Sequence, residues 1–323
     1  AYLSLCFLIA AFMEISTPSF IVQFDSRPNI LVLEGVFDGR ELAAAKADKL
    51  EIVVHSDWQL QLLERDGAEG IRRVWAKFDT GMHRLGFTPE SAGVVRARLA
   101  ALGIETPGVM SHLACADEPG LTDTARQMAV FGAVCKRFPG SPVSLANSAG
   151  VLLHPDSHLD WVRPGLMLYG VSPLPKGDGT DFGLRPAMTL SARLLSIQDV
   201  AMGDAVGYGA TWQAPRDCRI GIVSIGYGDG YPWCATAAGE VLVRGKRVPL
   251  AGRVSMDMLG VDLTALPAAR VGDEVTLWGA GLAVEEVARA VGTSPYELVC
   301  RVSRRVPRRM AGQVATLPLE TSA

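Results

Sequence analysis

The chain has 323 residues, which at roughly 150 residues per domain predicts about two domains. Hydrophobic residues make up 49% of the sequence and charged residues 20%, which excludes a disordered or collagen-like chain and allows a sizeable core. The formal net charge of −3 excludes the overall basic field that would hold nucleic acid or an acidic membrane surface.

The chain begins with an apolar run over residues 1–13. This run is shorter than the roughly 20 residues that cross a bilayer, and no Lys or Arg precedes it, as a secretory signal would need. The six cysteines form no C-x-x-C pair, which favours reduced thiols over disulfides or a zinc site. We therefore expect a soluble, cytoplasmic protein with neither a membrane nor a nucleic acid as partner.

Six short apolar runs rich in β-formers then recur with amphipathic stretches between them, at 30–35, 50–56, 73–79, 107–114, 143–148 and 159–165. Their apolarity is continuous rather than alternating, which is typical of strands covered on both faces, as in a parallel sheet. Two intervening stretches, 89–102 and 122–138, carry apolar residues at helical spacing. This alternation predicts a parallel α/β architecture, either a barrel or an open sheet.

The pattern changes after Gly170. Residues 171–186 are rich in Pro, Gly and polar residues and read as a linker. Short strand-like runs follow, interrupted by one predicted helix over 283–291, and the strands lie at 219–224, 240–243, 261–263 and 274–277. We expect a mainly antiparallel β domain there. The predicted domains are 1–180 and 181–323.

Polar side chains are concentrated at the carboxyl ends of the predicted parallel strands, where a β/α barrel carries its active site. They are Lys77 and Arg84 after the third strand, Ser111 and His112 after the fourth, Asn147 and Ser148 after the fifth, and Arg163 and Gly165 after the sixth. A single histidine or serine in such a place is more often structural. Four strand ends with the same character favour a functional site.

The residue types at these ends suit a phosphate-bearing organic cofactor. Ser148, with the backbone N–H groups near Gly165 and Leu166, can cradle a phosphate. Arg84 and Arg163 offer donor pairs to an anion or an aromatic heteroatom. The sequence has no metal-ligand spacing, no G-x-S-x-G, no G-x-x-x-x-G-K-[ST] and no G-x-G-x-x-G. A metal, a nucleophilic serine and a nucleotide loop therefore fit less well.

The predicted β domain has three unusual strings: VGYGATW (206–212), IGYGDGY (225–231) and GRVSMDM (252–258). A tyrosine between glycines, such as Tyr208, is usually only a turn residue. It becomes a candidate base if a partner lowers its pKa from about 10.

From about Asn29 to Arg308 the sequence resembles the pyridoxal 5'-phosphate (PLP)-dependent alanine racemases, whose fold is a TIM-type barrel followed by a β domain. The resemblance rests on motifs in the family's order and spacing, namely WAKFDTGMHRLGF (75–87), SHLACAD (111–117), ANSAG (146–150), DWVRPGLMLYG (160–170), VGYGATW, SIGYGDGYP (224–232), AGRVSMDM (251–258) and SRRVPR (303–308). It implies an isomerase that interconverts L-alanine and D-alanine by a two-base mechanism. A racemase of another amino acid and an inactive homologue remain alternatives, as do D-alanine supply for peptidoglycan and alanine catabolism as roles.

The resemblance implies a role for each matching residue. Tyr208 would be the base that removes the α-proton from L-alanine, with His112 beside it and Arg163 next. Arg163 would also hydrogen-bond the pyridine nitrogen of PLP and keep it unprotonated. The cofactor phosphate would be bound by Asn147, Ser148, Gly165 and Leu166.

The substrate side of the implied site draws on both domains. Arg84 would contact the cofactor's phenolic oxygen and the substrate carboxylate, and the backbone N–H of Met256 would bind the same carboxylate. Lys77 would brace Arg84, Tyr227 would line the entry path, and Asp257 would support the site. In the family the site forms between subunits, which implies a homodimer with shared active sites.

One family motif has no match in this sequence. The family binds PLP through a lysine in V-x-K-A-N-A-Y-G-H-G at the end of its first barrel strand, whereas the six lysines here are Lys46, Lys49, Lys77, Lys136, Lys176 and Lys246. Six predicted strands also stand where eight close a barrel. We therefore expect an incomplete barrel that does not hold PLP covalently and lacks racemase activity. A fragment or misread frame, a decayed gene product, and a chain with a new function are the three explanations.

Overall fold

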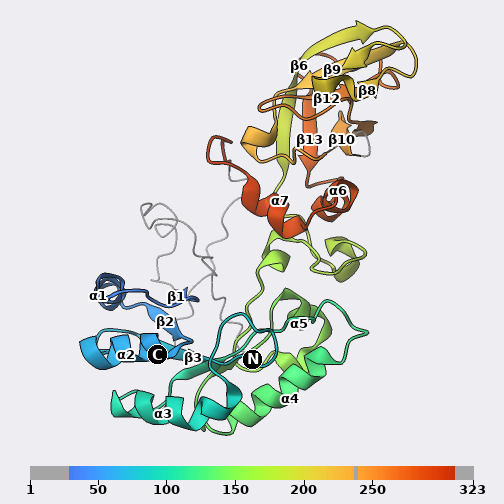
Figure 1. Cartoon of the computed structure of the whole chain (residues 1–323). Coiled ribbons are helices and arrows are strands. Elements are labelled where there is room, and N and C mark those ends of the chain that lie inside the picture. The colour runs from blue at the N-terminus through green and yellow to red at the C-terminus, as the bar shows by residue number, and fades with distance from the viewer. Residues whose placement is uncertain (1–28, 236–238, 310–323) are drawn as a thin grey trace, which may run out of the picture. The chain divides into compact units, whose positions relative to one another are not determined.

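The computed structural model describes residues 29–235 and 239–309, and the chain divides into two compact units between Ala187 and Met188. The first unit is drawn in blue to green and the second in green-yellow to red (Figure 1). Each unit has its own sheet. The prediction of a parallel α/β part followed by an antiparallel β part is confirmed.

The first unit contains a five-stranded parallel sheet with the strands in sequence order. The strands are β1 (Leu31–Val32), β2 (Glu51–Val54), β3 (Arg73–Lys77), β4 (Gly108–Met110) and β5 (Val143–Ser144). Its α-helices are α1 (Gly39–Ala47), α2 (Asp57–Asp66), α3 (Ala92–Ala101), α4 (Asp123–Cys135) and α5 (Ser148–Leu153). Both helices predicted from spacing, at 89–102 and 122–138, are confirmed as α3 with its preceding 3₁₀ turn and as α4.

The sixth predicted strand, 159–165, is wrong as a full strand. The structure gives it a single parallel bridge, between Ser144 and Trp161. The chain then reaches Pro164, which has no N–H to donate to a neighbouring strand, and Gly165 begins a 3₁₀ turn at Leu166–Tyr169. The segment therefore touches the sheet at one point and turns away with Arg163 near the strand ends.

The sheet is covered by apolar side chains on both faces, as continuous apolarity predicts. Because successive strand residues point to opposite faces, Ile52, Val74 and Val109 pack beneath the helices, while Val53, Trp75 and Met110 form a cluster on the other face. Figure 1 shows α1 to α4 lined along the helix-bearing face. The cluster of Val53, Trp75 and Met110 lies directly below the polar residues at the strand ends.

Local signals explain where the helices begin. Asp38 caps α1, its Oδ1 accepting from the backbone N–H groups of Arg40 and Glu41, both at 2.8 Å. On α4 the buried residues recur every three or four positions, at Thr124, Gln127, Phe131 and Val134. Two of these four are polar, so the buried stripe of α4 is not purely a packing surface.

The second unit is a six-stranded antiparallel sheet in the order β11-β10-β13-β6-β9-β12. The strands are β6 (Leu190–Val200), β9 (Cys218–Val223), β10 (Glu240–Val243), β11 (Lys246–Pro249), β12 (Leu259–Asp262) and β13 (Glu274–Trp278). A bridge between Leu250, directly after β11, and Val261 on β12 joins the two ends of this order. The sheet is therefore a nearly closed β barrel.

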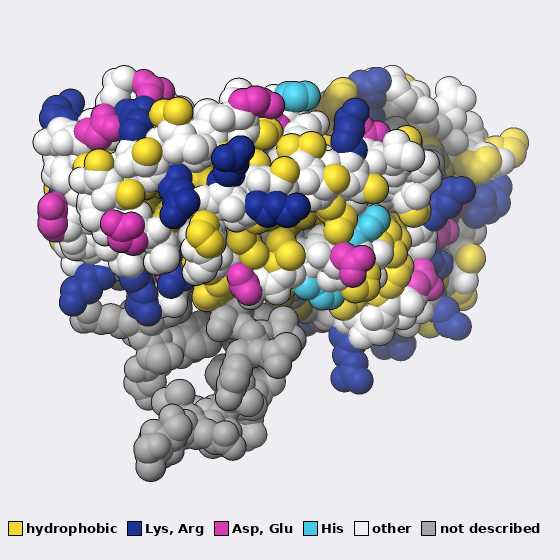
Figure 2. Space-filling view, turned by 90° about the horizontal axis from the view of Figure 1, so that it is seen from below, with side chains coloured by type: hydrophobic (Ala, Val, Ile, Leu, Met, Phe, Trp, Pro, Cys, Tyr) yellow, Lys and Arg dark blue, Asp and Glu magenta, His cyan; other side chains and the backbone are white. Residues whose placement is uncertain are grey.

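All four strands and the helix predicted in this unit are confirmed, the helix as α6 (Val284–Val291). Sequence reasoning missed β6, whose exposed polar residues interrupt its apolar ones. It also missed the small hairpin of β7 (Ala205–Val206) and β8 (Trp212–Gln213), and α7 (Pro295–Arg301), which Ser294 caps. Among the described residues, no helix is long and apolar enough to cross a membrane. On the face drawn in Figure 2, positive and negative side chains are interspersed.

Candidate active site

Four segments of the first unit meet at the carboxyl edge of the parallel sheet, and three of them carry predicted site residues there. Lys77 ends β3, His112 follows β4 by two residues, Ser144 ends β5, and Arg163 follows the bridge at Trp161. Backbone hydrogen bonds hold the last two strand ends in register: the N–H of Ser111 donates to Ser144 O at 3.2 Å, and that of Arg163 donates to Ala146 O at 2.9 Å. The fold thus brings residues 86 positions apart in the chain, from 77 to 163, to one edge.

Arg163 is the centre of this cluster and is 7% exposed. Its guanidinium donates to Ser144 Oγ, to Ser111 O and, at 3.2 Å, to Leu145 O. Its Nη2 also lies 3.4 Å from Nδ1 of His112. Because arginine can only donate, this Nδ1 is the acceptor and the imidazole proton resides on Nε2.

The electrostatics of the site follow from burial and three cations. Burial, followed by the charges of Arg163, Arg84 and Lys77, lowers the pKa of His112 to about 3. Burial, followed by the charges of Arg163 and Arg84, lowers the pKa of Lys77 to about 8. At neutral pH the imidazole is neutral while the cations around it stay charged, and the arrangement therefore suits an anionic ligand.

Arg84 lies on a loop that Asp79 organises. One carboxylate oxygen of Asp79 accepts from three consecutive backbone N–H groups, those of residues 81–83, at 2.9 to 3.0 Å. Phe87 closes the loop through two backbone bonds of 2.9 Å, to Lys77 and Asp79. Burial raises the pKa of Asp79, but the hydrogen bonds from Gly81 and His83 outweigh it and leave the pKa low. A small hollow of about 10 Å³ lies here, lined by Lys77, Phe78, Asp79, Met82, Arg84, Leu85, Ser111 and His112.

Ser148 and Gly165 form a second cluster at the same edge. Oγ of the buried Ser148 accepts from the N–H groups of Gly165 at 3.0 Å and Met167 at 3.3 Å. Two acceptor bonds use both lone pairs of the hydroxyl and leave its hydrogen for an acceptor. Asn147 caps α5, accepting from Gly150 at 2.9 Å, and donates to Leu113 O at 3.1 Å. The converging hydroxyl and amide groups suit a phosphate, and Leu166 is buried beside them.

The second unit gathers the other predicted residues on three loops. Tyr208 lies in the turn between β7 and β8, and the glycines at 207 and 209 supply the positive φ of +80° and +72° that the turn requires. The N–H of Tyr227 donates to Ser255 O at 3.0 Å, which joins its loop to the loop of Met256 and Asp257. Tyr208 is 73% exposed and Met256 57%. Tyr227 and Asp257 are exposed as well.

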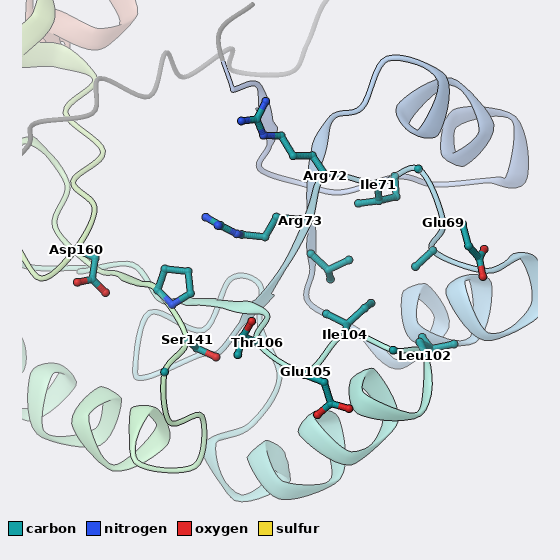
Figure 3. Close-up of a pocket in the computed structure, with 16 residues that line it drawn as sticks. Glu69, Ile71, Arg72, Arg73, Leu102, Ile104, Glu105, Thr106, Ser141 and Asp160 are labelled. Atoms are coloured by element: carbon teal, nitrogen blue, oxygen red, sulfur yellow. The ribbon is translucent and has the colours of Figure 1, made fainter. Parts of the chain in front are cut away.

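A larger hollow lies at the opposite edge of the parallel sheet. Its volume is about 980 Å³, and it is lined by residues that precede strands β3, β4 and β5, such as Arg72, Thr106 and Ser141. Figure 3 shows Arg73 extending into this space. Since the amino ends of barrel strands contribute to stability rather than to catalysis, this hollow is not the candidate site.

Two residues of the carboxyl-edge site were not predicted from the sequence. Ser144 lies inside a run that reads as an apolar strand, and no sequence signal marks it. Gln127 lies on α4, where it donates to His112 O at 3.0 Å. A polar residue in the buried stripe of an amphipathic helix was the signal available for Gln127.

Comparison with protein families gives two adjacent matches. The alanine racemase N-terminal domain matches residues 19–173, and the alanine racemase C-terminal domain matches residues 187–310. The first match begins ten residues before Asn29, where the motif resemblance starts. Together the two matches cover most of the chain.

Individual relatives agree with the family match. The chain is 51% identical to the biosynthetic alanine racemase of Pseudomonas aeruginosa over 282 residues, which covers 87% of this chain and 78% of that protein. It is 48% identical to the alanine racemase of Nitrosococcus oceani over 290 residues, covering 89% and 81%.

Solved structures are similar over the same extent. The crystal structure of the Pseudomonas aeruginosa enzyme superposes with a TM-score of 0.84 at 49% identity, covering 88% of this chain and 80% of that one. The alanine racemase of Bartonella henselae, solved with covalently bound pyridoxal phosphate, superposes with a TM-score of 0.76 at 28% identity, covering 87% and 79%.

Proposed function

The chain belongs to the alanine racemase family, a family of isomerases, and we propose that it interconverts L-alanine and D-alanine with PLP as its cofactor. The observation that carries the proposal is the buried Arg163, held against His112 and the ends of β4 and β5, next to the hydroxyl and amide donors around Ser148. A phosphate-bearing heteroaromatic ring matches this pair of clusters.

The residues present fit PLP at both ends. The hydrogen of the buried Ser148 hydroxyl and the N–H of Leu166 would bind the phosphate, with the amides of Gly165 and Met167 holding that hydroxyl and Asn147 fixing the start of α5. Arg163 would donate to the pyridine nitrogen. When bound, PLP supplies an electron sink that acidifies the α-proton of the amino acid. Because arginine keeps its own proton, Arg163 would leave the ring nitrogen unprotonated.

The substrate carboxylate would be bound by the cationic hollow. Arg84 faces it from the ordered loop, and Lys77 lines it from β3. The backbone N–H of Met256, on an exposed loop of the second unit, would contribute another donor, and Tyr227 and Asp257 would lie beside it at the entry.

Tyr208 would move the proton. We propose that its phenolate removes the α-proton from L-alanine, with His112 next to it, neutral and able to donate from Nε2. The exposure of Tyr208 supports an arrangement in which the second unit of one copy covers the first unit of another, so that the enzyme is a homodimer with shared sites. In that arrangement Arg163 would polarise the His112 imidazole from its Nδ1 side.

The broader setting of the protein is part of the same proposal. The similarity to biosynthetic racemases supports a role in supplying D-alanine. The five cysteines that the structure describes are all free thiols, which supports a reducing, cytoplasmic location. The change of character after Gly170 supports domains of residues 1–180 and 181–323.

Racemisation by the pure protein tests the proposal directly. The protein incubated with PLP should convert L-alanine to D-alanine, measured with a D-amino acid oxidase assay. Borohydride treatment followed by peptide mapping would show whether a lysine carries PLP, against the expectation from the missing lysine motif. Tyr208→Phe should abolish conversion while PLP binding persists, whereas the matched control Tyr296→Phe, on α7, should convert normally. Conversion by Tyr208→Phe at the wild-type rate would overturn the role of this tyrosine, and no conversion by the wild-type protein would overturn the function.

A further inference from the structure

The buried side chain of Gln127 connects three segments of the candidate active site. It projects from α4 and is 1% exposed. Its Oε1 accepts from the N–H of Ala114 at 2.8 Å, and its Nε2 donates to His112 O at 3.0 Å and to Thr80 Oγ1 at 3.3 Å. The partners fix the orientation of the amide, because an N–H can only donate and a carbonyl can only accept.

These bonds continue to the guanidinium at the centre of the site. Thr80 Oγ1 accepts from Gln127 and is also hydrogen-bonded to Ser111 Oγ, 2.8 Å away. The carbonyl oxygen of Ser111 then accepts from Arg163. Gln127 is therefore joined to Arg163 by two routes, through Thr80 and Ser111 and through His112.

We propose that Gln127 is a positioning residue for the reaction: it fixes the backbone around His112 and the hydroxyl of Thr80, and so keeps the imidazole against the Arg163 guanidinium. The proposal rests on the proposed function, because the reaction concerned is racemisation. A buried polar network whose members are all satisfied holds one geometry, and a small displacement of a catalytic group reduces the rate strongly.

The chain contains a matched control for this role. Gln59 on α2 is also 1% exposed, and it connects the ends of β1 and β2 in the same manner. It accepts from the N–H of His55 at 2.8 Å and donates to Glu34 O at 2.9 Å. Gln127 and Gln59 thus lose similar hydrogen bonds when replaced, but only Gln127 is bonded to His112.

The test compares Gln127→Met with Gln59→Met, since methionine has nearly the shape of glutamine and forms none of these hydrogen bonds. The first readout is the ring signal of His112 at pH 7 in protein labelled with carbon-13 histidine, identified among the five histidines by its loss in His112→Asn. The second readout is kcat and KM for L-alanine. In Gln127→Met we expect the His112 signal to move and kcat/KM to fall roughly 10- to 100-fold, mostly in kcat. Gln59→Met should lower the melting temperature comparably and leave both readouts at the wild-type values.

The two readouts separate failure of this inference from failure of the function. If the wild-type protein does not racemise alanine, the proposed function fails, and the His112 signal still decides whether Gln127 positions the ring. A folded Gln127→Met with an unmoved His112 signal and wild-type kcat/KM would overturn the inference. If Gln127→Met does not fold, Thr80→Val removes one branch of the network and should move the His112 signal in the same direction. An unmoved His112 signal in Thr80→Val would then also contradict the positioning role of Gln127.

Discussion

The indole ring of Trp75 occupies the space that a side chain at Gly108 would need. A Cβ at Gly108 would lie 2.2 Å from the ring, which is closer than any real contact. The ring cannot retreat, because its Nε1 donates to the buried Glu51 at 2.7 Å and its other side meets Trp161 edge-on with 6.2 Å between ring centroids. This pair fills the layer directly beneath the candidate active site.

Gly108→Ala should therefore destabilise the first unit by roughly 1–3 kcal/mol, the range for overpacking a core. Urea unfolding followed by tryptophan fluorescence would measure the loss. Gly132→Ala on α4 is the matched control, because a Cβ there meets nothing within 4 Å and should stabilise the helix by roughly 0.5–1 kcal/mol. Equal effects of the two substitutions would contradict the packing described here.

Stability should fall in acid because His112 is buried in its neutral form. Its pKa is about 3 in the folded protein and about 6.5 in the unfolded chain, so the unfolded state binds the extra proton between these values. The contribution of the neutral His112 to the free energy of unfolding is fully present above pH 6.5. It is lost as the pH falls toward 3, at up to about 1.4 kcal/mol per pH unit.

Comparison with His112→Asn isolates this contribution. Burial also lowers the pKa of His55, which acts in the same direction in both proteins. The free energy of unfolding of His112→Asn should therefore depend less steeply on pH between 6.5 and 4 than that of the wild-type protein. Parallel curves would show that His112 titrates normally.

Lys77 should react as a free amine at unusually low pH. Burial and the charges of Arg163 and Arg84 lower its pKa to about 8. Competitive labelling with acetic anhydride, followed by mass spectrometry, should give a midpoint near pH 8 for Lys77. Lys246, exposed on β11, serves as the control. A midpoint for Lys77 equal to that of Lys246 would mean that the cationic cluster is looser than described.

Ser148→Ala should weaken PLP binding about 10- to 100-fold, since hydrogen bonds to a charged group contribute roughly 1.5–3 kcal/mol. The matched control is Ser157→Ala, because Ser157 is equally buried and donates to His154 O at 2.7 Å on the other side of α5. It should lose stability and keep its affinity for PLP. Titration of PLP absorbance measures the affinity of both variants. An equal loss of affinity in the two would contradict the place of Ser148 in the phosphate site.

Much of the candidate site could be predicted because the ends of the strands can be recognised in the sequence. The apolar runs at 73–79 and 107–114 predicted the strands, and the polar residues at their carboxyl ends predicted the edge. Gln127 could not be found in that way, because its role depends on which strand ends α4 packs against. The sixth strand failed for a related reason, since apolar composition around Trp161 does not reveal that Pro164 turns the chain away after one bridge.

The sequence by itself determined the two-part architecture, the alternation of strands and helices, and the family, because periodicity and motif order are properties of the chain. Only the tertiary structure decided that His112 is neutral, that its Nδ1 faces Arg163, and that a glutamine from a helix joins the two. Protonation and hydrogen-bond direction depend on burial and on neighbours distant in the chain, and these come into existence only when the strands and helices pack.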